Sequence, residues 1–212
     1  MSNKKLSFFQ TQIKFSRKGT DSAKAITSMT NASPPVMTTD EVLKDGDVVH
    51  ITSNNEQVRG FYMVKVKSSG SYELVGQDFT QVGAITNAKL VKAQTHAFCM
   101  ATSLDVEPAT ISFSDVTTNC DDYPQEEGEL EAGSASGNAY WNPENPTSNM
   151  LEEMMFSQEE LFFQFKPKET NILTGFRANV ESWKMAGQTK EKWTADFGLK
   201  LKSRPMRVTL TA

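Results

Sequence analysis

The chain has 212 residues, of which 38% are hydrophobic and 23% are charged, and its formal net charge is −4. This length is enough for a sizeable core in one large all-β domain. The sequence has no apolar run of about 18 residues, which a membrane helix would need. It also has no apolar segment after its basic start, which a secretion signal would need. The sequence pI of about 5.3 argues against a protein that binds nucleic acid by neutralising its phosphates.

The charges are segregated along the chain. Residues 93–165 contain fourteen Asp and Glu residues and no Lys or Arg, whereas residues 1–92 carry a net charge of +4 and residues 166–212 a net charge of +6. A monomer gains little from this segregation, but copies of one chain that pack together can use oppositely charged faces to align. The pattern therefore predicts self-association.

The first 25 residues are predicted to form an N-terminal arm. They are mostly polar, and their apolar anchors are Phe8, Phe9, Ile13 and Phe15. A segment of this kind is poorly ordered unless it docks on a neighbour. We therefore assign residues 1–25 to the arm and residues 26–212 to a single domain, which contains an acidic loop over residues 119–144.

Most of the sequence after the arm has the pattern of short β-strands. Residues 47–52 and 60–67 are rich in β-branched and aromatic residues, and a polar turn separates them. Residues 97–102 and 109–113 are short apolar runs that we expect to be buried strands. Further strands are predicted at residues 24–29, 36–39, 71–75, 161–165 and 206–210.

The C-terminal third has the clearest alternation of apolar and polar residues. Phe176, Ala178 and Val180 alternate with polar side chains in the first of two strands. In the second strand the alternating residues are Trp193, Ala195, Phe197, Leu199 and Leu201. Altogether about ten short strands, with turns every 8–12 residues, indicate a mainly β fold of the sandwich or barrel type.

One α-helix is predicted over about residues 146–156. Asn145 is a favourable N-cap, and Pro146 suits the first helical position. The apolar residues of this segment recur on the side opposite Glu152 and Glu153, and they are Met150, Leu151, Met154 and Met155. We therefore expect the helix to flank the sheet and to pack its methionine-rich side on it.

Few residues are suited to catalysis or to binding a cofactor. His50 and His96 are the two histidines, and each is expected at a surface or interface rather than in a catalytic site. Cys99 and Cys120 lack the CxxC spacing and are expected to be reduced structural thiols. The glycine-rich motifs of nucleotide-binding loops are absent from the sequence. We therefore predict no enzyme activity, no cofactor and no metal.

Two alternatives involve the acidic segment. Its carboxylates could bind a hard cation such as calcium, although the spacing and central glycine of an EF-hand loop are missing; they are Asp121, Asp122, Glu126, Glu127, Glu129 and Glu131. Paired carboxylates could also serve a weak hydrolase such as a glycosidase, with Tyr140 and Trp141 as sugar platforms. We favour a solvated or intersubunit loop.

The order of features from Gly128 to Phe165 resembles the major tail proteins, or tail tube proteins, of long-tailed bacteriophages. An acidic segment with small residues precedes a short strand, a proline pair, the single helix and an apolar strand. The segments that carry the resemblance are Glu129–Glu131, Ser134–Asn142, Pro143, Asn145–Pro146, Met150–Phe156, Leu161–Phe165, Gly175–Trp183 and Lys192–Lys202. Residues 26–75 add a Pro-Pro break, LKDGDVVHI and YELVGQD, so that about two thirds of the chain is involved.

The resemblance implies a β-sandwich or barrel with one flanking helix, assembled as hexameric rings that stack into a hollow tube. Such a tube holds the tape-measure protein, meets tail terminator and tail tip proteins at its ends, and lets DNA pass without sequence-specific binding. The implied location is the virion, after assembly in the host cytoplasm, with no membrane. The subunit of such a tube is a structural protein rather than an enzyme.

These observations define a set of candidate interface residues. They are the arm residues Phe8 and Phe9, the acids Asp121, Asp122, Glu126, Glu127, Glu129 and Glu131, the aromatic Trp141, and the bases Lys200, Lys202 and Arg204. The alternative function is a stand-alone β-sandwich module that binds sugar or protein through Tyr140 and Trp141. The size of the purified species separates the two functions, because a tube subunit forms rings or filaments.

Overall fold

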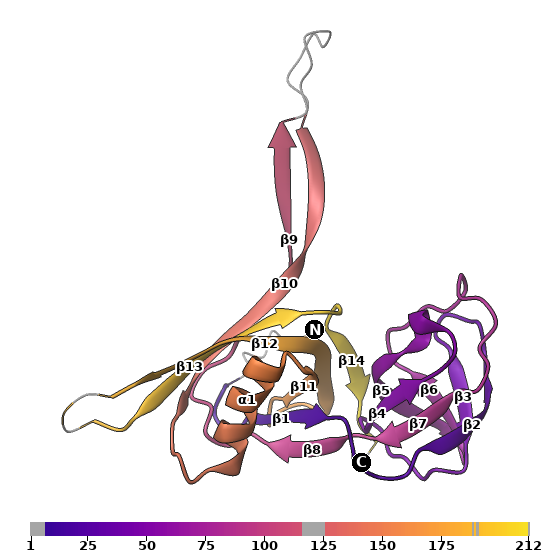
Figure 1. Cartoon of the computed structure of the whole chain (residues 1–212), viewed down its shortest axis with the longest axis horizontal. Helices are drawn as coiled ribbons and strands as arrows, with labels where there is room; N and C mark the ends of the chain where they lie inside the picture. Colours follow the sequence, from indigo (N-terminus) through magenta and orange to yellow (C-terminus); the bar gives the residue numbers. More distant parts are fainter. Residues whose placement is uncertain (1–6, 116–125, 188, 190, 212) are drawn as a thin grey trace, which may run out of the picture. The chain divides into compact units, whose positions relative to one another are not determined.

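A computed structural model describes residues 7–115, 126–187, 189 and 191–211 (Figure 1). The described part is mainly β and contains one α-helix, as predicted. The chain divides into two compact units, whereas the sequence predicted a single domain after the arm. The first unit is Met1–Met100, Glu159–Arg177 and Pro205–Ala212, and the second is Ala101–Gln158 and Ala178–Arg204.

A closed six-stranded barrel forms the larger part of the first unit. Its strands are β2 (Lys24–Met29), β3 (Val36–Thr39), β4 (Val48–Thr52), β5 (Gly60–Ser68), β6 (Ser71–Leu74) and β7 (Lys89–Lys92), and they pair in the order β2-β3-β6-β5-β4-β7. A short 3-10 helix, η1 (Glu56–Val58), connects β4 to β5. The interior is apolar and includes Met37, Val49, Ile51, Tyr62, Val64, Leu74 and Leu90. The barrel strands therefore bury side chains in a common core.

The rest of the first unit is a group of paired strands that includes the N-terminal one. It consists of β1 (Gln12–Arg17), β8 (Gln94–Ala97), β11 (Glu160–Lys166), the beginning of β12 (Ile172–Ala186) and β14 (Met206–Thr209). β1 lies between β8 and β11 and pairs with both. Ile13 and Phe15 are buried. The predicted arm is therefore wrong for Gln12–Arg17, because these residues form an interior strand.

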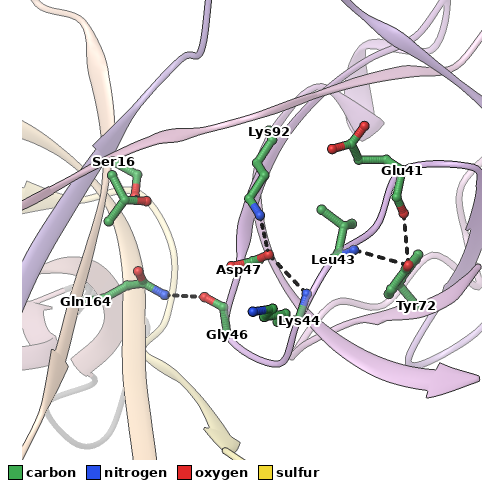
Figure 2. Close-up of polar contacts among 10 residues, drawn as sticks. Ser16, Glu41, Leu43, Lys44, Gly46, Asp47, Tyr72, Lys92 and Gln164 are labelled. Atoms are coloured by element: carbon green, nitrogen blue, oxygen red, sulfur yellow. Dashed lines mark hydrogen bonds and ion pairs between the residues drawn. The ribbon is translucent and has the colours of Figure 1, made fainter. Parts of the chain in front are cut away.

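Barrel and strands share a second apolar cluster within the first unit. Phe61 and Met63 from β5 pack with Phe162 from β11 and with Met206 and Val208 from β14. Figure 2 shows the polar contacts nearby, in which the buried amide of Gln164 donates from Nε2 to the carbonyl oxygen of Gly46 at 2.8 Å. This bond satisfies a polar group that burial would otherwise leave at a cost.

Figure 2 also shows how the loop before β4 is fixed. The hydroxyl of Tyr72 donates to the carbonyl oxygen of Glu41 at 2.9 Å and accepts from the amide of Leu43 at 3.2 Å. The carboxylate of Asp47 pairs with Lys92 Nζ at 2.7 Å and accepts from the amide of Lys44 at 3.0 Å. The loop is therefore held by side chains from two other strands, β6 and β7.

The second unit contains a sheet and the helix. The sheet has the order β12-β13-β10-β9, with β9 (Asp105–Asp115), β10 (Glu126–Tyr140) and β13 (Thr194–Leu201). Strand β13 alternates as predicted, since Ala195, Phe197, Leu199 and Leu201 are buried. Trp193 differs from the prediction, because it precedes the strand and is exposed.

Helix α1 (Pro146–Ser157) has the predicted start and nearly the predicted length. The Asn145 side chain accepts a hydrogen bond from the amide of Thr147 at 2.9 Å, which caps the helix. Leu151 and Met154 are buried, while Met150 and Met155 are half-buried. The predicted apolar stripe is confirmed, although Phe156, which follows it, is 76% exposed.

Two predicted segments differ from the structure around residues 105–140. The acidic loop expected over residues 119–144 is wrong for Glu126–Tyr140, which form the whole of β10. The run at 109–113 was expected to be buried, but Ala109, Thr110 and Ile111 are exposed. The first error arises because glycine, serine and acidic residues suggest a loop unless a partner strand supplies the hydrogen bonds. The second arises because a short apolar run suggests burial, whereas Ala109, Thr110 and Ile111 lie in a hairpin with β10.

Candidate assembly interface

Strands β9 and β10 form a two-stranded hairpin that continues beyond the sheet of the second unit (Figure 1). Residues Ser134–Tyr140 of β10 pair with β13 on one side, whereas Glu126–Ala132 pair with β9 alone. We call Glu107–Asp115 together with Glu126–Ala132 the ribbon. An isolated two-stranded hairpin is only marginally stable in water. The ribbon therefore lacks the support that a third strand would give it.

The ribbon is exposed on both of its faces wherever its side chains are described. Ala109 and Thr110 are exposed, and so are their cross-strand partners Ala132 and Glu131. Glu107 is exposed as well. Ile111 alone is 56% exposed. Adjacent positions of a strand point to opposite faces, so the part of the ribbon whose side chains are described covers no core of its own chain on either side.

Glycines at the root of the ribbon allow β9 and β10 to approach closely. A Cβ atom at Gly133 would lie 2.1 Å from the carbonyl oxygen of Glu107, and one at Gly137 would lie 2.3 Å from that of Ser103. Larger residues at these two positions would force the strands apart. Glycine is therefore required at these two positions by close packing of the backbone.

A basic group lies beside the root of the ribbon. Lys200 pairs with Ser134 across β13 and β10 and is exposed, as are Lys202 and Arg204. Lys202, Arg204 and Glu131 line one surface cavity of about 240 Å³. Among the described residues, none of these four side chains forms an ion pair within 4.0 Å, so their charges remain available to another molecule.

The opposite end of β10 carries an aromatic group. Trp141 lies beside Trp193, with ring centroids 5.5 Å apart, and its amide donates to the carbonyl oxygen of Trp193 at 2.9 Å. Lys192 Nζ lies 4.9 Å from the centre of the Tyr140 ring, a cation–π arrangement. Trp193 is 54% exposed. The predicted aromatic pair, Tyr140 and Trp141, is thus part of a larger group. Its most exposed member, Trp193, was not predicted to belong to it.

The structure separates the predicted interface residues into three regions. Glu131, Lys202 and Arg204 lie together at the root of the ribbon, with Lys200 nearby, and Trp141 lies at the other end of β10. Phe8 and Phe9 form an exposed turn before β1 in the first unit. Glu126, Glu127 and Glu129 occupy positions of β10 within the ribbon, and Asp121 and Asp122 lie outside the described residues.

Both histidines are partly buried in the first unit. Burial and, second, the positive charge of Lys18 lower the pKa of His50, whose ring meets Phe61 edge-on at 4.9 Å. Burial and, second, the charge of Arg17 lower the pKa of His96, whose ring lies 5.6 Å from that of Phe15. Each has one buried ring nitrogen, Nδ1 of His50 and Nε2 of His96, without a hydrogen-bond partner in the described part of the chain. Both are therefore neutral near pH 7.

The remaining candidate groups do not gather into a site. Cys99 is a free, exposed thiol, and Cys120 lies outside the described residues. Within residues 7–115, 126–187, 189 and 191–211, no three His, Cys, Asp or Glu side chains are placed to share a metal ion. No helix in this part of the chain has the length and apolar character needed to cross a membrane. The ribbon and its surroundings are therefore the candidate functional site.

Comparisons with known proteins found similar chains among solved structures only. No protein-family model matches the chain, and no curated protein matches it either. It is similar to a chain of a native gene transfer agent virion, with 14% identity over 56% of this chain and 90% of that one and a TM-score of 0.41. It is similar to a chain of the C6-symmetric tail of an empty gene transfer agent particle, with 15% identity over 64% and 92% and a TM-score of 0.41.

A third similar structure is a chain of the anti-feeding prophage baseplate, symmetrised sixfold. Identity is 6%, the TM-score is 0.37, and the match covers 81% of this chain and 98% of that one. The similar structures thus include chains of a tail and of a baseplate.

Proposed function

We propose that this chain is a structural subunit of a phage tail tube, which assembles from copies of itself into hexameric rings that stack around a channel for DNA. In this proposal the tube encloses the tape-measure protein and meets tail terminator and tail tip proteins at its ends. The location is the virion, and assembly takes place in the host cytoplasm. The subunit has no catalytic role.

The observation that carries the proposal is the ribbon. Where its side chains are described they are exposed on both faces, and no third strand of the described chain pairs with it, so the folded chain alone gives it little stabilisation. Docking on another molecule would bury it. A protein that repeats such a contact from copy to copy builds a closed ring or an open filament, depending on whether the rotation closes.

The distribution of charge supports a second copy as that other molecule. Residues 93–165 have fourteen acids and no base, so all 22 bases of the chain lie outside this span. The described acids of the ribbon and the bases Lys200, Lys202 and Arg204 form no ion pair with each other within 4.0 Å. Copies of one chain can pair these charges between molecules.

The experiment that tests the proposal is the size and shape of the purified full-length chain at increasing concentration. Sedimentation velocity should show species larger than a monomer, and negative-stain electron microscopy should show rings or tubes of uniform diameter. A chain that stays monomeric at every concentration and in every salt would contradict the proposal.

The exposed aromatic group favours one alternative, a stand-alone β-sandwich module that binds sugar or protein. Tyr140 and Trp193 present ring surface to solvent at the end of β10 and β13. Exposed aromatic rings are common in sites that bind sugars or proteins. A monomer that binds a sugar in a glycan screen, and loses binding in Trp193→Ala, would establish this alternative instead.

A further inference from the structure

The pattern of residues along β10 changes at the point where the strand leaves the sheet. Within the sheet, the odd-numbered positions Ala135 and Ala139 are buried, and the even-numbered positions Ser136 and Asn138 are exposed and polar. In the ribbon, the next odd-numbered position toward the tip after Gly133 is Glu131, an exposed acid. The apolar face and the polar face of the strand therefore exchange sides.

The register shows the same exchange on β9. Ala132 faces Ala109, and Ile111 occupies the next position of the same row toward the tip, paired with position 130, a leucine. We call this row the outer row; its described members are Glu107, Ala109, Ile111 and Ala132. The other row, the inner row, has Thr110 facing Glu131. By the register and the sequence, the inner row continues with glutamates at positions 127 and 129, and the outer row continues with phenylalanine at position 113 and glycine at position 128 and then with acids at positions 115 and 126.

This exchange indicates which side of the ribbon is covered. A hairpin that only extended the sheet into water would need no apolar row. A hairpin that packed on its own unit would keep its apolar residues at the odd-numbered positions of β10, which are the buried positions within the sheet. The outer row instead has an apolar centre, Ala109, Ile111 and Ala132, with an acid, Glu107, at its root. An apolar centre with charged residues at its edge is the usual composition of a protein–protein interface.

Building on the proposed function, we propose that the outer row of the ribbon docks on a second copy of this chain and that the inner row stays in contact with solvent. The partner surface must combine exposed apolar side chains with bases, because the ribbon has acids and no base. The chain has a surface of this composition outside residues 93–165.

This surface is the turn with Phe8 and Phe9. Phe9 is 72% exposed, and the side chain of Gln10 in this turn is hydrogen-bonded to Lys168. Lys166 faces Gln12 in the adjoining strand pair, and the nearest acid in sequence, Glu169, is exposed. A second copy of the chain therefore provides both chemical features that the outer row requires.

The two rows supply a matched pair of probes on neighbouring residues. A photo-reactive benzoylphenylalanine is introduced either at Ile111, in the outer row, or at Thr110, in the inner row, both of which are exposed. The full-length proteins are assembled and irradiated, and the cross-linked peptides are identified by mass spectrometry. Mixing with isotopically labelled chain separates intermolecular from intramolecular products.

The expected result is an intermolecular product from position 111 that joins a peptide from residues 1–92 or 166–212, with at least several-fold less product from position 110. Equal or greater capture from position 110, or capture by residues 93–165, in samples that contain rings or tubes would overturn this inference and leave the proposed function standing. Samples without any assembly in the unmodified chain would overturn both.

A pair of substitutions tests the same inference without a probe. Ile111→Asp places a charge in the apolar row, and the concentration needed for half-assembly should rise about tenfold or more. Thr110→Asp adds the same charge one residue away in the inner row, and the rise should stay below about threefold. Both variants should melt like the parent chain, because neither side chain is buried. Equal effects of the two variants on assembly would contradict the assignment of the outer row.

Discussion

Ala109 and Ala132 face each other as Cα partners across β9 and β10, at the root of the ribbon. Two facing positions of a hairpin can be joined by a two-residue turn, for which Asn-Gly is favourable. The ribbon can therefore be shortened at this point without disturbing the pairing of β10 with β13.

The first prediction concerns this shortened chain. When residues 110–131 are replaced by Asn-Gly, the chain should fold with a melting temperature within a few degrees of the parent, because the described ribbon side chains are exposed. Assembly should be lost. Circular dichroism and sedimentation velocity measure the two properties. Assembly that survives the deletion would show that the ribbon is dispensable.

The N-terminal strand gives the second prediction. Phe15 is fully buried in β1 between β8 and β11, so Phe15→Ala should reduce the free energy of unfolding by about 3–5 kcal/mol. Phe9→Ala is the matched control, because Phe9 precedes the strand and is largely exposed, and its cost should be below about 1 kcal/mol. Chemical denaturation of both variants gives the comparison. Equal costs would mean that β1 does not belong to the core.

The sequence predicts an element of this fold when the signal for it is local, and it fails when a strand is buried by a partner that is distant in the chain. The alternation in β13 and the cap at Asn145 are local, and both were read correctly. The burial of Phe15 arises from pairing with β11, about 150 positions away in the chain, and six residues beside a polar segment give no sign of it. A non-local partner of this kind leaves no periodic signal in a short strand.

The candidate interface was likewise predicted from the sequence only in part. The excess of acids between residues 93 and 165 is visible in the sequence, and the self-association that it predicts stays a prediction. The ribbon was missed, because strand β10 contains Gly128, Gly133 and Gly137, and glycine ordinarily marks a loop. The exchange of apolar and acidic rows could be recognised only after the register of β9 on β10 was known.

The helix gives a third prediction. Leu151 is buried on α1 and Phe156 is exposed on the same helix, so truncation of the two should have unequal costs. Leu151→Ala should lower the free energy of unfolding by about 2–5 kcal/mol, and Phe156→Ala by less than about 1 kcal/mol. Thermal melts of both variants provide the measurement. A Leu151→Ala chain that melts like the parent would show that α1 is not a packed element.

The fourth prediction concerns salt. If acids of the ribbon pair with bases of a second copy, assembly should weaken as salt is added, because charges separated by more than the Debye length of about 8 Å at physiological ionic strength are screened. Sedimentation over a salt series measures this effect, and Lys202→Gln, which removes one exposed base, should make the dependence shallower. Assembly promoted by salt would indicate that apolar burial dominates the contact.

The last prediction is the dependence of stability on pH. Burial lowers the pKa of both His50 and His96 below the ordinary 6.5, so the unfolded chain binds protons at these residues before the folded chain does. Their effect on stability is therefore absent at pH values well above 6.5, and stability should fall as pH decreases through 6.5 toward the lower folded pKa values. Asp45 and Asp78 do not contribute in this range, because their pKa values are lowered from 3.8.

Thermal melts between pH 7.5 and pH 5 measure this loss. The double variant His50→Gln/His96→Gln has no group that titrates in the range at these positions, so its melting temperature should vary less with pH than that of the parent. Each single variant should remove part of the effect. An unchanged pH dependence in the double variant would show that other groups cause the loss of stability in acid.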